Sequence, residues 1–264
     1  MNEVKRYLQR IYKTRYFLLH LVRWDLKYKF RRSKFGLLWT ILQPLLLTLI
    51  ISVVFGFVFK QDMKTYAPYI LSGLLVWEII LGAVIQNSSS FMAAETYIRQ
   101  YMHPIAIYPL RAALVSISVF CIALIGLLIW SIFIYPQNII VFLITLPLTL
   151  FIYFILCWAI GVISSHVHIR YRDYPYVMNL IMQFMWYLSP VFFKESMFEL
   201  SSVLHMVFVF NPITQVLQLI RKPLLDGKIA SFETYIYCLL LVIIIVLISW
   251  KVNKRAEPSV IYHF

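Results

Sequence analysis

A run of 25 residues without a charged side chain, 35–59, most constrains the fold of this chain. It follows 34 residues that include eleven Lys or Arg. At a rise of about 1.5 Å per residue, a helix of this length crosses a hydrocarbon core of roughly 30 Å with some tilt to spare. A basic flank is typical of the cytoplasmic side of a span. The pattern therefore predicts an integral membrane protein.

Five further segments complete a predicted map of six membrane helices. Residues 112–169 hold no Lys, Arg, Asp or Glu over 58 positions, and the turn signal Tyr135-Pro136-Gln137-Asn138 divides them into two spans. The predicted spans are 35–59, 67–92, 112–134, 139–163, 174–193 and 231–250. An even number of spans places both basic termini in the cytoplasm. The predicted fold class is therefore an all-α integral membrane protein with six transmembrane helices.

The net charge of +13 lies on one side of this map. The predicted cytoplasmic segments hold 18 Lys and Arg against 5 acids, whereas the outer segments hold 6 against 5. Because this asymmetry follows the positive-inside rule, we expect membrane lipids as partners and no nucleic acid. The composition agrees, since 13% of the residues are charged against about 25% in soluble domains.

Three segments outside the predicted spans carry further information. Residues 3–34 place apolar side chains at helical spacing between Lys and Arg, which predicts an N-terminal amphipathic helix in the membrane interface. Its apolar positions are Val4, Tyr7, Leu8, Ile11, Tyr12, Leu18, Leu19, Val22 and Leu26. Residues 93–111 form a cytoplasmic excursion with two prolines. Residues 194–230 form an outer segment whose apolar part is too short to cross, which predicts a re-entrant segment between helices five and six. Asn211-Pro212 then predicts the start of a short helix.

The sequence offers few residues for chemistry. It has no G-x-x-x-x-G-K-[ST] phosphate loop and no H-E-x-x-H motif. His166 and His168 are two residues apart and would point to different faces of a helix, so we expect surface histidines rather than metal ligands. Glu78 is the one carboxylate within a predicted span, which makes it a candidate functional residue because such a group is costly in a bilayer. Either protonation or a hydrogen bond to a neighbouring helix or subunit would stabilise it.

Five segments resemble, in order, those of ABC-2 type exporter permeases. The first is FRRSKFGLLWTILQPLL at 30–46, at the entry to the first helix. The others are YAPYILSGLLVWEII at 66–80, RYRDYPYVMN at 170–179, LSPVFF at 188–193 and NPITQVLQLIRKPLL at 211–225. One segment departs from the family pattern, since His103 stands where an aromatic residue usually precedes the proline.

The resemblance implies a single ABC-2 type transmembrane domain over 1–264, with an interface helix at 1–34, a membrane domain at 35–250 and a cytoplasmic tail at 251–264. It implies a homodimer in the bacterial cytoplasmic (inner) membrane with two copies of a separate ABC ATPase subunit. ATP and magnesium would bind to that partner, so we expect no cofactor and no catalytic residue in this chain. The short loops look most like permeases that export a lipid-linked polysaccharide such as O-antigen, capsule or teichoic acid.

Two alternatives stay open. A permease for a drug or another small amphiphile would have the same map. A membrane-embedded transferase acting on a lipid-linked sugar would need clustered acids or a His-Asp pair, whereas the acids here are isolated. The 20 Phe, 18 Tyr and 7 Trp favour a sugar as the substrate, because aromatic faces stack on sugar rings while Tyr and Trp edges supply hydrogen bonds.

The candidate site residues fall into three groups. The cytoplasmic loops predict contacts that couple the chain to the ATPase, through Glu95, Arg99, His103, Pro104, Arg170, Arg172 and Asp173. Two copies of the chain are expected to enclose one substrate pathway between helices one, two and five. Bulky aromatic residues at membrane depth are candidates to line it, namely Trp77, Phe184, Trp186 and Tyr187. Phe184 and Tyr187 share a helix face, whereas Trp186 points elsewhere. Glu78 is the possible intramembrane polar site, and we expect no metal site.

Overall fold

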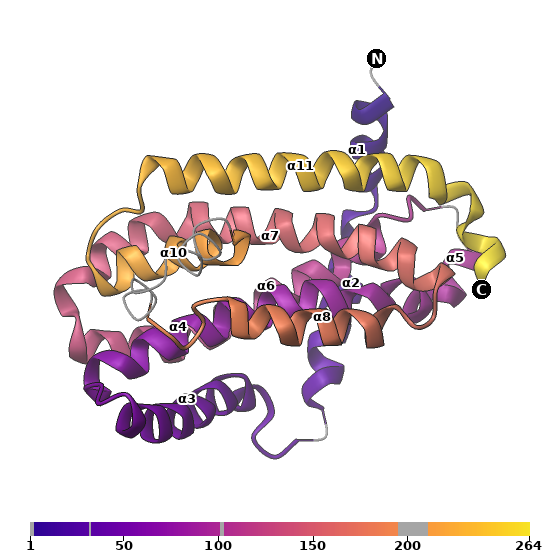
Figure 1. The fold of residues 1–264 in the computed structure, drawn as a ribbon. Coiled ribbons are helices and arrows are strands. Elements are labelled where there is room, and N and C mark those ends of the chain that lie inside the picture. Colours follow the sequence, from indigo (N-terminus) through magenta and orange to yellow (C-terminus); the bar gives the residue numbers. More distant parts are fainter. Residues whose placement is uncertain (1–2, 32, 101–102, 195–210) are drawn as a thin grey trace.

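The computed structural model describes residues 3–31, 33–100, 103–194 and 211–264, and the regular structure in these ranges is helical (Figure 1). The α-helices are α1 (Glu3–Lys13), α2 (Arg15–Phe30), α3 (Trp39–Val58), α4 (Met63–Leu81), α5 (Glu95–Gln100), α6 (Ile107–Ile134), α7 (Ile139–Arg170), α8 (Tyr174–Leu188), α10 (Pro212–Leu225) and α11 (Phe232–Ala256). Short 3-10 turns precede α3 and α7 and follow α11. The all-α class predicted from the sequence is confirmed.

Five helical segments within the described residues are long and apolar enough to cross a membrane. They are Gly36–Val58, Met63–Ser90, Ile107–Ile134, Pro136–Arg170 and Phe232–Tyr262. Each overlaps one of the predicted spans. The six-span topology stays a prediction.

The predicted fifth span is shorter in the structure than in the sequence map. Helix α8 has 15 residues and ends at Leu188 instead of Phe193. At about 1.5 Å per residue it measures roughly 22 Å, less than the roughly 30 Å of a hydrocarbon core. Ser189 adopts extended dihedrals (φ −109°, ψ 144°) because it precedes Pro190, whose ring disfavours the helical conformation at that position. The span is predicted to end at Phe193 because the sequence is apolar up to that residue, but Pro190 ends the helix earlier.

Helix α8 nevertheless carries the chain along the bundle. Figure 1 shows α8 starting at the end where α7 finishes and running beside α4 toward the end where α10 and the start of α11 lie. The apolar part of the predicted re-entrant segment, residues 197–210, lies outside the described residues. Its continuation is confirmed as a helix, since the Asn211 side chain accepts a hydrogen bond of 2.9 Å from the Ile213 N–H at the start of α10.

The N-terminal helices run across the other helices rather than along them (Figure 1). Ile11, Leu18 and Val22 are buried against a second hydrophobic cluster that includes residues of α5, α6, α7 and the C-terminal turn. The predicted apolar stripe therefore packs partly on the protein itself. Tyr12 and Leu19, which the sequence assigned to the same stripe, are exposed.

Both ends of the chain lie at one end of the bundle. The Asn253 side chain donates a hydrogen bond of 2.9 Å to the hydroxyl of Tyr7, whose ring contacts Trp250 at a centroid distance of 5.4 Å. Burial raises the pKa of Tyr7 above its usual value, and the nearby Glu257 carboxylate adds to that rise. The contact places the termini together, and their side of the membrane stays a prediction.

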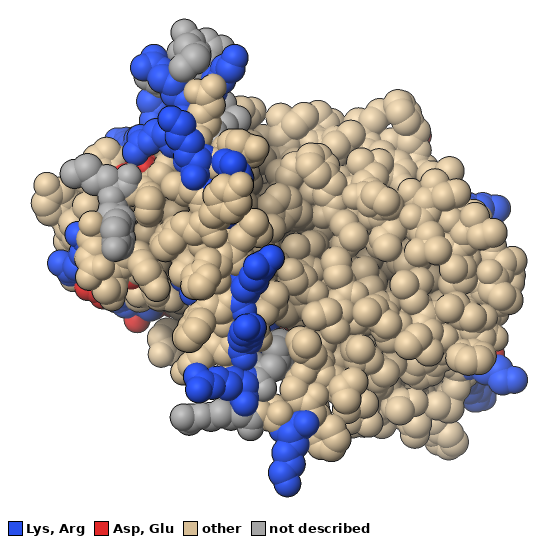
Figure 2. Space-filling view, turned by 180° about the vertical axis from the view of Figure 1, so that it is seen from behind, with Lys and Arg blue, Asp and Glu red and all other residues tan. Residues whose placement is uncertain are grey.

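The surface agrees with a membrane environment. Figure 2 shows a broad face without charged side chains beside a narrow band of Lys and Arg. Exposed basic residues of α2 include Arg23, Lys27 and Lys29. The main hydrophobic core lies between α4, α6, α7, α10 and α11. Helix α3 packs on α4 and α6 from one side and leaves most of its apolar residues exposed.

Candidate functional site

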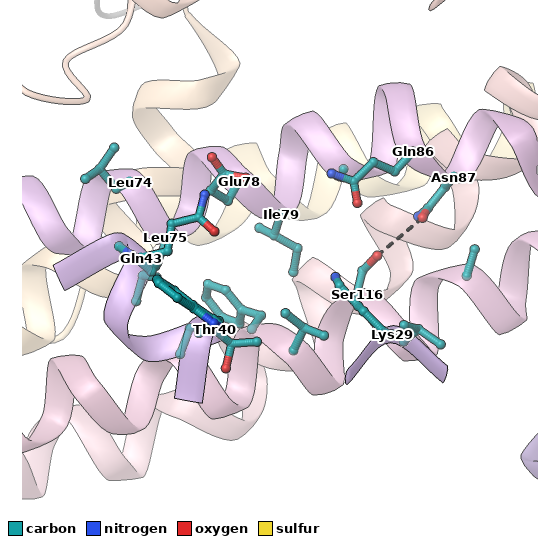
Figure 3. Close-up of a pocket in the computed structure, with 18 of the residues that line it drawn as sticks. Lys29, Thr40, Gln43, Leu74, Leu75, Glu78, Ile79, Gln86, Asn87 and Ser116 are labelled. Atoms are coloured by element: carbon teal, nitrogen blue, oxygen red, sulfur yellow. Dashed lines mark hydrogen bonds between the residues drawn. The ribbon is translucent and has the colours of Figure 1, made fainter. Parts of the chain in front are cut away.

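A cavity of about 680 Å³ lies between α2, α3, α4 and α6 (Figure 3). One end is formed by α2, and the opposite end is apolar, with Leu47, Leu74 and Leu75. The polar side chains that line the cavity are Asp25, Tyr28, Lys29, Thr40, Gln43, Glu78, Gln86, Asn87 and Ser116. Several polar side chains therefore reach into a mostly apolar space, beside helices that are long and apolar enough to span a membrane.

Glu78 faces this cavity. Every residue from Tyr66 to Ile79 is buried or half-buried except Glu78, which is exposed. Figure 3 shows its side chain and that of Gln43 from α3 directed toward the same space. Within the described residues, the Glu78 carboxylate makes no hydrogen bond or ion pair. Glu78, the polar site predicted from the sequence, thus lies at the wall of a cavity. Its role stays a prediction.

Two amide side chains also face the cavity without a hydrogen-bond partner among the described residues. Gln43 and Gln86 are exposed to the cavity, and in the part of the chain that the structure describes neither forms a side-chain hydrogen bond. A polar group without a partner at membrane depth costs several kcal/mol unless water or a ligand satisfies it. The three side chains together therefore offer one carboxylate acceptor and two amide donor–acceptor groups to an occupant.

An irregular helix segment positions Gln86. After α4 the chain forms a π-helical turn at Gly82–Gln86 and then a 3-10 turn at Asn87–Ser90. Such wide turns inside helices are frequent at functional sites. The next residue, Asn87, is held from two sides, because its Oδ1 accepts a bond of 3.3 Å from Ser116 and its backbone carbonyl accepts one of 3.0 Å from Ser165. The end of this helix is thereby tied to α6 and α7.

An ion pair fixes α2 at the end of the cavity. Arg111, in the first turns of α6, donates from Nε to Asp25 Oδ2 at 2.5 Å and also from Nη2 to Oδ1. Both side chains are largely buried. This bidentate geometry is the strong form of such a pair. No sequence pattern predicted this ion pair, although Asp25 is one of only two acids among the first 34 residues.

A second polar cluster, which we call the outer clamp, lies toward the other end of α4. It consists of Arg221 on α10 and the groups that bind it, at Tyr69, Ser72, Pro190 and Val191. Arg221 is 5% exposed and donates to the carbonyls of Pro190 at 2.5 Å and Val191 at 2.6 Å. It also donates to the Tyr69 carbonyl at 3.2 Å and lies 3.7 Å above the Tyr69 ring.

The clamp needs a glycine beside it. A Cβ at Gly73 would lie 2.5 Å from the Arg221 guanidinium and would collide with the Val191 carbonyl. The sequence analysis missed the clamp because it placed Arg221 in an outer segment, where a basic residue carries no structural signal.

The predicted coupling residues lie at the end of the bundle that carries α1 and α2. Glu95 and Arg99 form an exposed ion pair of 2.9 Å on α5. Arg172 points at the sulfur of Met92, the last residue of the predicted second span, which brings the second predicted loop close to the start of the first. The remaining members are placed as follows: His103 stacks on Phe17, Pro104 is buried, and Arg170 and Asp173 are exposed. The predicted coupling residues are thus close enough together to form one contact surface. Their contact with an ATPase stays a prediction.

The predicted lining aromatics do not reach the cavity. Trp77 is buried against Trp186, with ring centroids 5.0 Å apart. Phe184 and Tyr187 are exposed on the outer side of α8. The structure thus places Phe184 and Tyr187 together and Trp186 on another face of α8, and their role as lining residues stays a prediction.

The expectation of surface histidines is wrong. His166 and His168 are both buried, because α7 continues to Arg170 instead of ending at 163. They do point in different directions, as their spacing predicts. His166 Nε2 lies 3.0 Å from the Asn253 side chain, and His168 Nδ1 lies 2.9 Å from the Ser88 hydroxyl. Both serve as internal hydrogen-bonding groups between helices.

Known proteins similar to this chain are permeases. The O-antigen export system permease protein RfbA of Klebsiella pneumoniae is 23% identical over 204 residues, which cover 77% of this chain and 78% of the relative. RfbA of Myxococcus xanthus is 22% identical over 222 residues, covering 80% and 81%. The polysialic acid transport protein KpsM of Escherichia coli is 23% identical over 245 residues, covering 90% and 92%. No family model matches the chain. The chain is thus a distant homologue of ABC-2 type polysaccharide export permeases.

Proposed function

We propose that this chain is the permease subunit of an ABC exporter that moves a lipid-linked polysaccharide across the bacterial cytoplasmic membrane. The observation that carries the proposal is similarity to polysaccharide export permeases over 77% to 90% of this chain. The helical membrane architecture and the absence of a phosphate-loop motif from the sequence support it. Energy would come from a separate ATPase subunit that binds ATP and magnesium.

The assembly that we propose is a homodimer with two ATPase subunits. A single chain has little enclosed space for a polymer, whereas α3 and α8 both present apolar faces. A second copy on these faces would enclose a pathway that includes Phe184 and Tyr187. The loops around Glu95 and Asp173 would meet the ATPase, with both termini in the cytoplasm.

The polar cavity favours this function over the export of a drug. A hydrophobic drug would leave the carboxylate and the two amides of the cavity without partners. A hydroxyl-rich substrate would satisfy them. A transferase would need clustered acids or a His-Asp pair, whereas the acids of this chain are isolated along the sequence.

Deletion of the gene from its host tests the proposal. We expect surface polysaccharide to disappear while lipid-linked polymer accumulates in the cytoplasmic membrane, and we expect a plasmid copy to restore export. The purified chain alone should hydrolyse no ATP. Unchanged surface polysaccharide together with increased drug sensitivity would overturn the proposal in favour of a drug permease. Turnover of ATP by the isolated chain would contradict the separate ATPase.

A further inference from the structure

We propose that the cavity between α2, α3, α4 and α6 binds a neutral, hydroxyl-bearing sugar residue of the exported glycolipid. This inference rests on the proposed function and adds to it a site and the chemical group that the site recognises. The site is built by Glu78, Gln43 and Gln86, with Trp39 at its edge.

The size of the cavity suits such a group. Its volume of about 680 Å³ falls within the 300–1,000 Å³ that is usual for small-molecule sites. Its walls are polar toward α2 and apolar at Leu74 and Leu75. An amphiphile could therefore place a polar group against Glu78 while its apolar part remained beside the leucines of the same helix.

The hydrogen-bonding groups of the cavity match hydroxyls. Each sugar hydroxyl both donates and accepts, and the two amides Gln43 and Gln86 do the same. The Glu78 carboxylate can accept from two hydroxyls at once. Because none of these three side chains bonds to another described residue, all of this capacity is available to an occupant.

Trp39 adds an aromatic surface next to these groups. It lies one helical turn before Gln43, so the two side chains share a face of α3. The residue is 43% exposed, and its ring contacts that of Phe35 edge-on at a centroid distance of 5.8 Å. An aromatic ring beside amides offers a sugar ring one apolar face and several polar edges.

The charges of the cavity select a neutral group. The Glu78 carboxylate would repel a phosphate or a sugar acid in a low-dielectric site. Arg111, the arginine nearest the cavity on α6, is already bound bidentately by Asp25. Lys29, at the α2 end of the cavity, acts electrostatically on Glu78, but the three charged residues that line the cavity, Asp25, Lys29 and Glu78, still leave one negative charge in excess. The body of the cavity therefore suits hydroxyls better than anions.

Binding of two defined lipids to the full-length chain in detergent tests the proposal. The probes are a polyprenyl-diphosphate disaccharide and the same polyprenyl diphosphate without sugar. The wild-type chain should bind the disaccharide lipid more tightly. The substitutions Gln43→Leu and Gln86→Leu should each weaken that binding about ten-fold, the effect of losing one or two hydrogen bonds, and leave the sugar-free lipid unaffected. Glu78→Gln, whose amide can still bond to hydroxyls, should weaken it less. The exposed Gln137→Leu on the loop before α7 is the matched control and should change neither.

Several results would overturn this assignment. One is equal binding of the two lipids by the wild type. Another is unchanged discrimination in both glutamine variants. A third is loss of the dimer in the variants, which would assign the cavity to assembly. Export in cells separates this inference from the proposed function: cavity variants that export normally in a strain where deletion abolishes export would reject only the sugar site. Gln86→Leu removes the second exposed amide of the cavity, so a folding defect in Gln43→Leu would leave the test intact.

Discussion

Removal of the Arg221 side chain should destabilise the protein more than any single surface change. The guanidinium donates to three carbonyls at 2.5, 2.6 and 3.2 Å and to the Ser72 hydroxyl at 3.5 Å. Arg221→Met keeps a long side chain but leaves these carbonyls without their donor in a largely buried site. An unsatisfied buried carbonyl costs about 1–3 kcal/mol, and loss of the buried charge offsets part of the sum, so we expect a net loss of stability of about 3 kcal/mol.

The neighbouring residue supplies the control. Lys222→Met makes the same kind of change one position along α10, at an exposed side chain that pairs with Asp226 at 3.3 Å. Exposed pairs of this kind contribute about 0–1 kcal/mol. Arg221→Lys should fall between the two, because a single ammonium cannot bind three divergent carbonyls as the planar guanidinium does.

The measurement is the free energy of unfolding in mixed micelles of dodecyl maltoside and SDS, followed by tryptophan fluorescence. The reasoning predicts a clear separation between Arg221→Met and Lys222→Met. If the two variants unfold at the same SDS fraction, the clamp does not stabilise the fold, and its hydrogen bonds are offset by the cost of burying the charge.

Three further substitutions test other contacts. Gly73→Ala should strongly reduce expression and stability, because its Cβ would collide with the outer clamp. Gly82→Ala is the control, since a Cβ there would lie no closer than 3.9 Å to a neighbouring atom, and it should have little effect. Equal thermal stability of the two variants would contradict this reasoning. Asp25→Asn should weaken the ion pair that attaches α2 to α6 and so increase protease cleavage between α2 and α3. An unchanged digestion pattern would show that this ion pair does not fix α2. Asp173→Ala should leave assembly intact but reduce the stimulation of the partner ATPase, with Asp226→Ala as a control; full stimulation would remove the loop from the coupling surface.

The sequence predicts the helices well and their ends less well. Uncharged runs locate the spans because a charge inside a bilayer is costly. The end of α8 follows from Pro190, a local signal that the apolar composition up to Phe193 concealed. The end of α7 is different, since His166 and His168 lie in the helix and are buried in the folded chain, where Asn253 and Ser88 each bond to one ring nitrogen. No local pattern contains that information.

The candidate site was predictable only in part. Glu78 stands out because a lone carboxylate in a span is rare. Gln43 and Gln86 do not stand out, since an amide in an apolar run is a weaker signal and its exposure depends on how α3 meets α4. The aromatic prediction used membrane depth and, on the fifth predicted helix, the helix face. Trp77 packs against Trp186 in the folded chain, and the lining role of these residues stays a prediction.

Within a single chain, helix α3 is a less buried wall of the cavity than α4. The opposite wall, α4, is held at one end by the outer clamp and at the other by the contacts of Asn87 with α6 and α7. Its span is 72% buried, whereas the span of α3 is 17% buried. Entry of a sugar that exceeds the resting cavity therefore requires α3 to separate from α6, where the two helices approach closely at Gly126 and Ile41.

A cross-link between these two helices tests that requirement. An ideal Cβ at Gly126 lies 3.8 Å from the Cβ of Ile41, the usual separation in a disulfide. In a background without Cys121, Cys157 and Cys238, the pair Ile41→Cys and Gly126→Cys should form a disulfide on oxidation. We expect oxidised cells to lose export of the polysaccharide and to recover it on reduction, while the single substitutions export throughout. Full export in quantitatively cross-linked protein would show that α3 stays against α6 during transport and that the substrate enters elsewhere.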